Sequence, residues 1–170
     1  MIFQFRMLCD EDDYFLREYE VPYDMTLAAF RDFINKDLQY RPEELTSFFT
    51  ADDRWEKQRE FTLMEMGDSS GEGPETMESI RLGQIIHNLR DRLIYLFDMF
   101  GDRAYYLELT GAYEADPQAS YPREIYAVAE APDQYDPSKN REDEDEGSAF
   151  EEMMGDFNDF EGDDNYDDEY

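Results

Sequence analysis

The chain has 170 residues with 45 acidic and 15 basic side chains, which gives a formal charge of −30 at neutral pH. Such a charge repels phosphate backbones and anionic lipid, so it argues against direct binding to nucleic acid or a membrane and favours a basic protein surface as partner. A single cysteine excludes an intramolecular disulfide, and no apolar run has the length of a membrane span or the form of a signal peptide. We therefore expect a cytoplasmic protein.

The first 40 residues predict two strands and a helix. Strands are expected from Ile2 to Cys9 and from Tyr14 to Val21, joined by an acidic turn at residues 10–13. Thr26 is a good N-cap, and apolar residues follow it at three- and four-residue steps as far as Leu38. This spacing predicts an amphipathic helix whose apolar stripe belongs to the core.

The middle of the chain predicts two more strands. Residues 44–50 and 61–66 are rich in residues that favour strands, and the second stretch alternates between apolar and polar side chains. Between them, residues 52–59 form a charged connection that carries the only tryptophan, Trp55.

A surface loop and a second helix are expected next. Residues 67–74 include three glycines, two serines and a proline, a composition typical of a loop. Ser79 is the expected cap of the helix that follows. Its apolar stripe comprises Leu82, Ile85, Ile86 and Leu89.

A hairpin comes next, and the domain is organised around it. The apolar run from Leu93 to Phe97 suits a strand covered on both faces, and the alternation from Tyr105 to Thr110 suits a strand with one buried face. The turn between them holds the candidate site residues of the domain, Asp98, Gly101 and Asp102. One interpretation is turn chemistry, in which Gly101 supplies a positive φ and an aspartate accepts backbone N–H groups. The other is a pair of catalytic carboxylates.

Together with a last strand at residues 125–129, these elements predict an α+β fold with a mixed or antiparallel sheet of about five to seven strands and two main helices. Composition changes abruptly afterwards. Residues 136–170 hold 16 acidic and 2 basic side chains, a charge of −14, which leaves −16 for residues 1–135. A segment this charged buries too little apolar surface to offset its ordering entropy. We therefore expect a folded domain at 1–135 and a disordered acidic tail at 136–170.

Aromatic residues and methionines are spaced among the acids of this tail. They are either incidental to a solubilising segment or the anchors of a binding segment, in which the carboxylates attract a basic groove and speed the encounter. The candidate anchors are Phe150, Met153, Met154, Phe157, Phe160, Tyr166 and Tyr170.

The order of these elements resembles the plasmid pRiA4b ORF-3-like family, whose members are α+β domains often carried by plasmids and transposons. The resemblance rests on the helix after Thr26, the strand from residue 44, the helix at Leu82 and the hairpin turn, and it is expected to cover residues 1–132. Two family motifs are altered here. The Tyr-Asp-Phe-Gly-Asp-x-Trp turn has an extra residue before Gly101 and lacks its Trp, and the Pro-Pro-Glu-Asp-x-Gly-Gly segment is reduced to Ala131–Pro137. The resemblance implies a fold and no particular reaction.

These observations predict a non-enzymatic interaction protein whose acidic tail binds a basic protein partner, such as a nucleic-acid-handling protein. No catalytic, cofactor-binding or metal-binding residue is assigned under this hypothesis. The alternative is an enzyme of unknown reaction that uses Asp98 and Asp102 with a divalent cation. A tail that folds back to mask a site on the domain is disfavoured, because the negatively charged domain would repel it.

Overall fold

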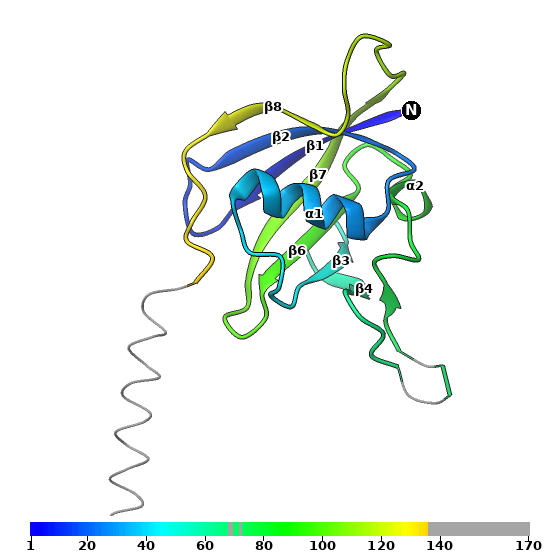
Figure 1. Cartoon of the computed structure of the whole chain (residues 1–170), viewed down its shortest axis with the longest axis vertical. Coiled ribbons are helices and arrows are strands. Elements are labelled where there is room, and N and C mark those ends of the chain that lie inside the picture. Colours follow the sequence, from blue (N-terminus) through cyan, green and yellow to red (C-terminus); the bar gives the residue numbers. More distant parts are fainter. Residues whose placement is uncertain (68–69, 72, 136–170) are drawn as a thin grey trace, which may run out of the picture. The chain divides into compact units, whose positions relative to one another are not determined.

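The structure is a computed structural model that describes residues 1–67, 70–71 and 73–135 (Figure 1). The chain divides into two units, Met1–Gln134 and Tyr135–Tyr170, and only Tyr135 of the second is described. The candidate tail anchors therefore lie outside the described residues: Phe150, Met153, Met154, Phe157, Phe160, Tyr166 and Tyr170.

A mixed sheet of eight strands forms the centre of the first unit. Every described pair of neighbouring strands is antiparallel except β4 and β5, which run parallel. Across the sheet the order is β5 (Glu75–Thr76), β4 (Lys57–Thr62), β3 (Ser47–Ala51), β6 (Arg92–Asp98), β7 (Arg103–Tyr113), β1 (Ile2–Cys9), β2 (Leu16–Pro22) and β8 (Arg123–Val128). With the helices α1 (Leu27–Leu38) and α2 (Leu82–Ile85), this confirms the α+β class.

The expected five to seven strands are too few, because the short strand β5 was not predicted. It consists of Glu75 and Thr76 alone, which is too short to produce an alternating pattern in the sequence. The strand exists because it pairs with the last two residues of β4, where Phe61 lies opposite Glu75.

Strand β4 lies earlier in the chain than residues 61–66, where the sequence predicted it. Its first half replaces part of the expected charged connection, and the side chains from Lys57 to Arg59 are exposed. Charged side chains are common on edge strands, and β5 covers only the end of β4. Met64 and Met66 consequently follow the strand, with 56% and 64% of their surface exposed.

Helix α1 lies across one face of the sheet, as Figure 1 shows. The Thr26 hydroxyl accepts the N–H of Ala29 at 3.1 Å, which confirms the predicted cap. The helix ends at Gln39, whose φ of 59° is left-handed and whose N–H reaches the Asn35 carbonyl. Its buried apolar residues are those of the predicted stripe, Leu27, Phe30, Ile34 and Leu38.

Aromatic rings connect α1 to the middle of the sheet. Phe48 of β3 stacks on Phe30 of the helix, with ring centroids 5.8 Å apart, and on Tyr95 of β6, with centroids 4.8 Å apart. All three residues are fully buried. This stack forms the centre of the core.

Helix α2 is a single turn, shorter than predicted. It begins after Arg81 rather than at Ser79, and the Arg81 N–H donates to the Gln84 side chain at 2.8 Å. The chain leaves the helix at Ile86, whose backbone is extended, and just beyond it the Asp91 carboxylate accepts the backbone N–H of His87 at 2.8 Å. Leu89, which was predicted to belong to the apolar stripe of this helix, therefore lies beyond the helix and is 62% exposed. In the described part of the chain, no helix is long and apolar enough to cross a bilayer.

The opposite face of the sheet carries a smaller apolar cluster. Ile94, Leu96 and Ala104 are buried there beneath partly buried rings that include Trp55 and Tyr106. Strand β6 is thus covered on both faces, as its apolar sequence predicted. The predicted alternation in β7 is also observed, because Tyr105, Leu107 and Leu109 are buried on the α1 side.

Candidate functional site

One end of the sheet brings together the motifs identified in the sequence. Antiparallel pairing places Cys9 of β1 opposite Tyr105 of β7, and Ser47 of β3 opposite both Leu96 of β6 and Thr62 of β4. The β1–β2 turn, the β6–β7 turn, the start of β3 and the end of β4 therefore share this end. Residues 131–134 return to it through the contacts described below. We call it the hairpin end.

The carboxylates of the β6–β7 turn both have structural partners. Asp98 accepts the N–H of Gly101 at 2.9 Å, as the turn interpretation predicts. The turn was expected to have its positive φ at Gly101, but the residue with a positive φ is Asp102, at 52°. Aspartate tolerates the left-handed region better than most residues do, so a glycine is not required there. The Asp102 carboxylate, which is exposed, pairs with Lys57 at 3.4 Å.

Arg103, the first residue of β7, is the centre of the hairpin end. Its guanidinium binds the carboxylate of Glu11 through two N–H groups at 2.7 and 3.1 Å, and it lies 3.6 Å from that of Asp98. It also donates to the backbone carbonyls of Asp133 at 2.8 Å and Gln134 at 3.0 Å. Only 9% of the side chain is exposed. Arg103 therefore joins both turns to residues 131–134.

Two buried tyrosines lie beside this arginine and bind the same segment. The Tyr40 hydroxyl donates to the Pro132 carbonyl at 2.5 Å and also hydrogen-bonds the Tyr105 hydroxyl. Because a carbonyl only accepts, the proton shared between the tyrosines comes from Tyr105. Burial raises the pKa of Tyr40 to about 12 and raises that of Tyr105 as well. Both hydroxyls therefore keep their protons at neutral pH and act as structural donors.

Gln134 completes the attachment of residues 131–134. Its side-chain amide accepts the backbone N–H of Arg41 at 2.7 Å and donates to the Arg41 carbonyl at 3.0 Å. This pairing ties the segment to the loop that follows α1. The structure therefore places residues 131–134 beside the Gly101-Asp102 turn, so the two altered family motifs meet at Arg103.

A second polar cluster lies between α1 and the edge of the sheet. Asp37 of the helix accepts a hydrogen bond from the buried hydroxyl of Tyr19 at 2.7 Å. Arg17 lies 3.7 Å from the Asp37 carboxylate and 3.5 Å from that of Glu124 on β8. Burial raises the pKa of Glu124 to about 7, assisted by a hydrogen bond to Asp37 and by its charge. Glu124 therefore keeps its proton at acidic pH and loses it as pH rises through about 7.

We expect Glu124→Gln to stabilise the protein in alkaline solution only. A folded-state pKa raised from 4.5 to about 7 means that the native state holds this proton more tightly than the unfolded chain does. Its contribution to stability is therefore fully present at acidic pH and is lost as pH rises through 7. Because the side chain is partly exposed, the gain in the free energy of unfolding should be about 1 kcal/mol at about pH 8 and close to zero at about pH 5.

Urea unfolding at the two pH values measures this difference. Glu114→Gln, at an exposed position just beyond β7, is the matched control. The change in the free energy of unfolding that it causes should be the same at both pH values. A gain for Glu124→Gln that is the same at acidic and alkaline pH would contradict a raised pKa for Glu124.

The described residues include no group of three or more histidine, cysteine, aspartate or glutamate side chains placed to hold a metal ion. Of the predicted turn residues, Asp98 lies in the Arg103 cluster and Asp102 lies outside it. Sequence reasoning missed the central role of Arg103. Its only signal in the sequence is a charged residue that directly follows the turn, at the first position of the strand.

These features define the class of protein: an α+β protein with one mixed sheet, a helix that covers one face of the sheet, and a polar cluster at one end of it. The chain belongs to the plasmid pRiA4b ORF-3-like family, whose model matches residues 2–167. The resemblance was expected to end near residue 132, whereas the match includes most of residues 136–170.

A protein of unknown function from Methanosarcina mazei Go1 has a similar crystal structure. The TM-score is 0.61 at 14% sequence identity, and the similarity covers 74% of this chain and 68% of that one. At this identity the likeness shows the fold alone. No curated protein matches the chain.

Proposed function

We propose that this protein is a non-enzymatic interaction protein that binds a basic surface of a protein partner. The segment at residues 136–170 has the higher density of negative charge and therefore attracts a basic surface more strongly per residue. The folded unit adds further negative charge. The partner we favour is a nucleic-acid-handling protein, because an acidic segment can compete with nucleic acid for the same cationic surface.

The distribution of ion pairs in the folded unit carries this proposal. Residues 1–135 contain 29 acidic and 13 basic side chains. Eight of these basic residues form ion pairs with acids of the same unit: Arg6, Arg17, Arg31, Lys57, Arg59, Arg92, Arg103 and Arg123. Most of the cations are thus neutralised internally, and the excess of carboxylates is left to interact with solvent or a partner.

The turn carboxylates have structural roles, which argues against a role in catalysis. Asp98 stabilises its own turn and the position of Arg103, and Asp102 is paired with Lys57. A general base or a metal ligand needs a lone pair directed at the reacting group or cation. In this arrangement the oxygens of Asp98 are directed at protein donors instead.

The tail anchors are tested in a tagged pull-down from native lysate at low and high salt. The full chain is compared with a variant in which all seven anchors are serine: Phe150, Met153, Met154, Phe157, Phe160, Tyr166 and Tyr170. A chain ending at residue 135 is the second comparison. We expect the full chain to retain a basic partner that high salt releases, the serine variant to retain it weakly, and the short chain to lose it. An identical set of partners for all three chains would contradict the proposal.

A further inference from the structure

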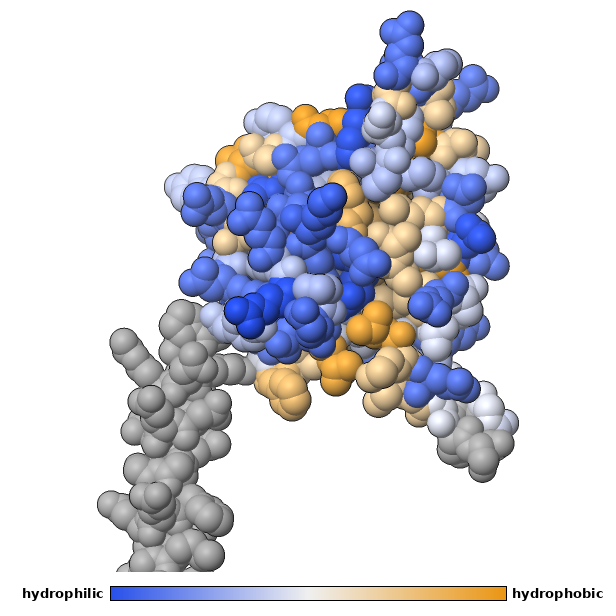
Figure 2. All heavy atoms as spheres, viewed as in Figure 1, coloured by the Kyte–Doolittle hydropathy of each residue, from blue (hydrophilic) through white to orange (hydrophobic). Residues whose placement is uncertain are grey.

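An apolar hollow opens at the hairpin end, between the start of β3, the end of β4 and the β6–β7 turn. Its volume is about 210 Å³. Figure 2 shows apolar side chains gathered along the lower edge of the molecule, below the polar surface of α1. The apolar residues that line the hollow are Leu45, Leu63, Met64, Met66, Pro74 and Met99.

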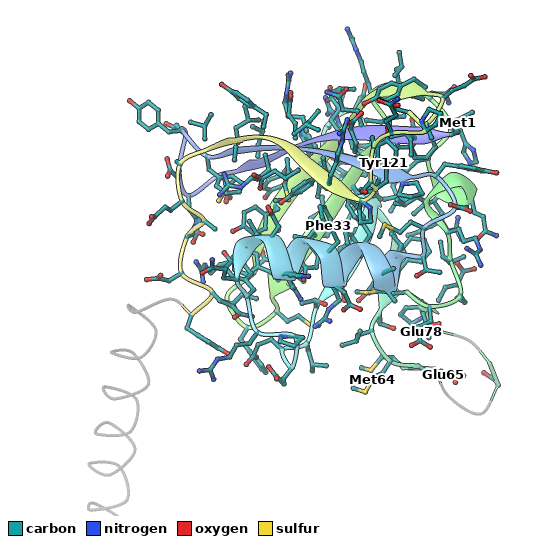
Figure 3. The ribbon with its side chains drawn as sticks, turned by 45° about the horizontal axis from the view of Figure 1, so that its top comes forward. Met1, Phe33, Met64, Glu65, Glu78 and Tyr121 are labelled. Carbon is teal, nitrogen blue, oxygen red and sulfur yellow. The ribbon has the colours of Figure 1, made fainter. Side chains whose placement is uncertain are left out.

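Methionines dominate this lining and are unusually exposed. Met64, Met66 and Met99 have 56%, 64% and 41% of their surface exposed, and Leu45 has 45%. Figure 3 shows Met64 and Glu65 together at the lower edge of the molecule, below α1. Exposed methionines adapt their shape to different apolar side chains and are over-represented on peptide-binding surfaces.

Negative charge surrounds the hollow. Among the described residues that line it, Glu60 is the only charged one, and exposed Glu65 separates the two methionines that follow β4. On the other side, Met99 belongs to the same turn as Asp98 and Asp102. The nearby cation Lys57 is paired with Asp102. An apolar group that enters the hollow would therefore be flanked by carboxylates.

We propose that this hollow binds a large apolar side chain from a basic amphipathic segment of the protein partner. The apolar residue enters between the methionines, and lysines or arginines on either side meet Glu60 and Glu65. This inference rests on the proposed function and adds what that proposal lacks: a site on the folded unit, and a requirement for apolar residues among the basic residues of the partner.

Charge decides between this occupant and the alternatives. A second copy of the chain would bring another 30 negative charges to a surface that is already acidic. The chain's own residues 136–170 carry a charge of −14 and meet the same repulsion. A basic segment is attracted by the same charges.

Two fluorescein-labelled peptides of equal length and charge test the site by fluorescence anisotropy with the full chain. One combines lysine with leucine in a helical amphipathic pattern, and the other has serine in place of each leucine. We expect the leucine peptide to bind about tenfold more tightly, because one large apolar side chain is buried. Met64→Ser combined with Met66→Ser should remove this advantage and leave the affinity of the serine peptide unchanged.

Leu89→Ser is the matched control, because this leucine is also exposed, at 62%, and does not line the hollow. It should keep the tenfold preference. Thermal melting checks that each variant is folded, and Met99→Ser, from the turn side of the hollow, provides an independent test. Equal affinities for the two peptides, or a preference that survives the methionine changes, would overturn the inference.

Sedimentation and the peptide titrations distinguish the other possible occupants of the hollow, and they also separate failure of this inference from failure of the proposed function. A dimer in sedimentation that the methionine changes dissociate would assign the hollow to a second copy. Tighter peptide binding by Phe157→Ser with Phe160→Ser would assign it to the chain's own tail. Salt-sensitive binding of both peptides with no preference would leave the proposed function intact and reject the hollow. No binding of either peptide at low salt would reject both.

Discussion

Replacing Arg103 with alanine is expected to lower the free energy of unfolding by about 2 kcal/mol, because its partners lose their donors in a largely buried place. The carboxylates of Glu11 and Asp98 would lose their cation, and two carbonyls of residues 133–134 would lose their hydrogen bonds. Chemical unfolding measures the loss. Hydrogen exchange should also show faster exchange in residues 131–135.

Arg6→Ala is the control for this change. Arg6 also pairs with a glutamate, Glu18 at 3.1 Å, but 51% of its side chain is exposed. Water replaces such a partner readily, so the loss should stay within about 0.5 kcal/mol. Similar losses for both variants would show that Arg103 does not hold the hairpin end together.

Phe48→Ala is expected to have the largest effect, a loss of about 4 kcal/mol in the free energy of unfolding. Its ring lies between Phe30 of α1 and Tyr95 of β6, so its removal leaves a cavity where the helix meets the sheet. Urea unfolding monitored by circular dichroism gives the value.

The next residue in the chain supplies the comparison. Phe49 points to the opposite face, where it is only partly buried and the ammonium group of Lys57 lies 4.7 Å from its ring centroid. Phe49→Ala should cost about 1 kcal/mol. A larger loss for Phe49 than for Phe48 would mean that the core lies on the other face of the sheet.

Elements with a strong local pattern could be predicted from the sequence. The cap at Thr26, the apolar stripe of α1 and the alternation in β7 are properties of short stretches of chain, and the structure confirms them. Elements that depend on distant partners were displaced or missed. Strand β5 exists because it pairs with Phe61 and Thr62 of β4, which lie 14 residues earlier in the chain.

The difference between local and distant contacts also explains which parts of the candidate site could be predicted from the sequence. The Asp98–Gly101 contact spans three residues, so turn chemistry was enough to predict it. Arg103 instead binds Glu11, 92 residues earlier, and the backbone about 30 residues later. The pairing of β1 with β7 brings Glu11 to Arg103, and residues 133–134 reach it after strand β8, which pairs with β2. No spacing within one segment could indicate such a cluster.

We propose that negative charge on this protein selects a basic partner. The most direct test is calorimetric titration of the full chain with the partner captured in the pull-down, repeated over a series of salt concentrations. We expect the affinity to fall by about tenfold between low and physiological salt. An affinity that stays constant across the series would contradict the account, because recognition would then not depend on the carboxylates.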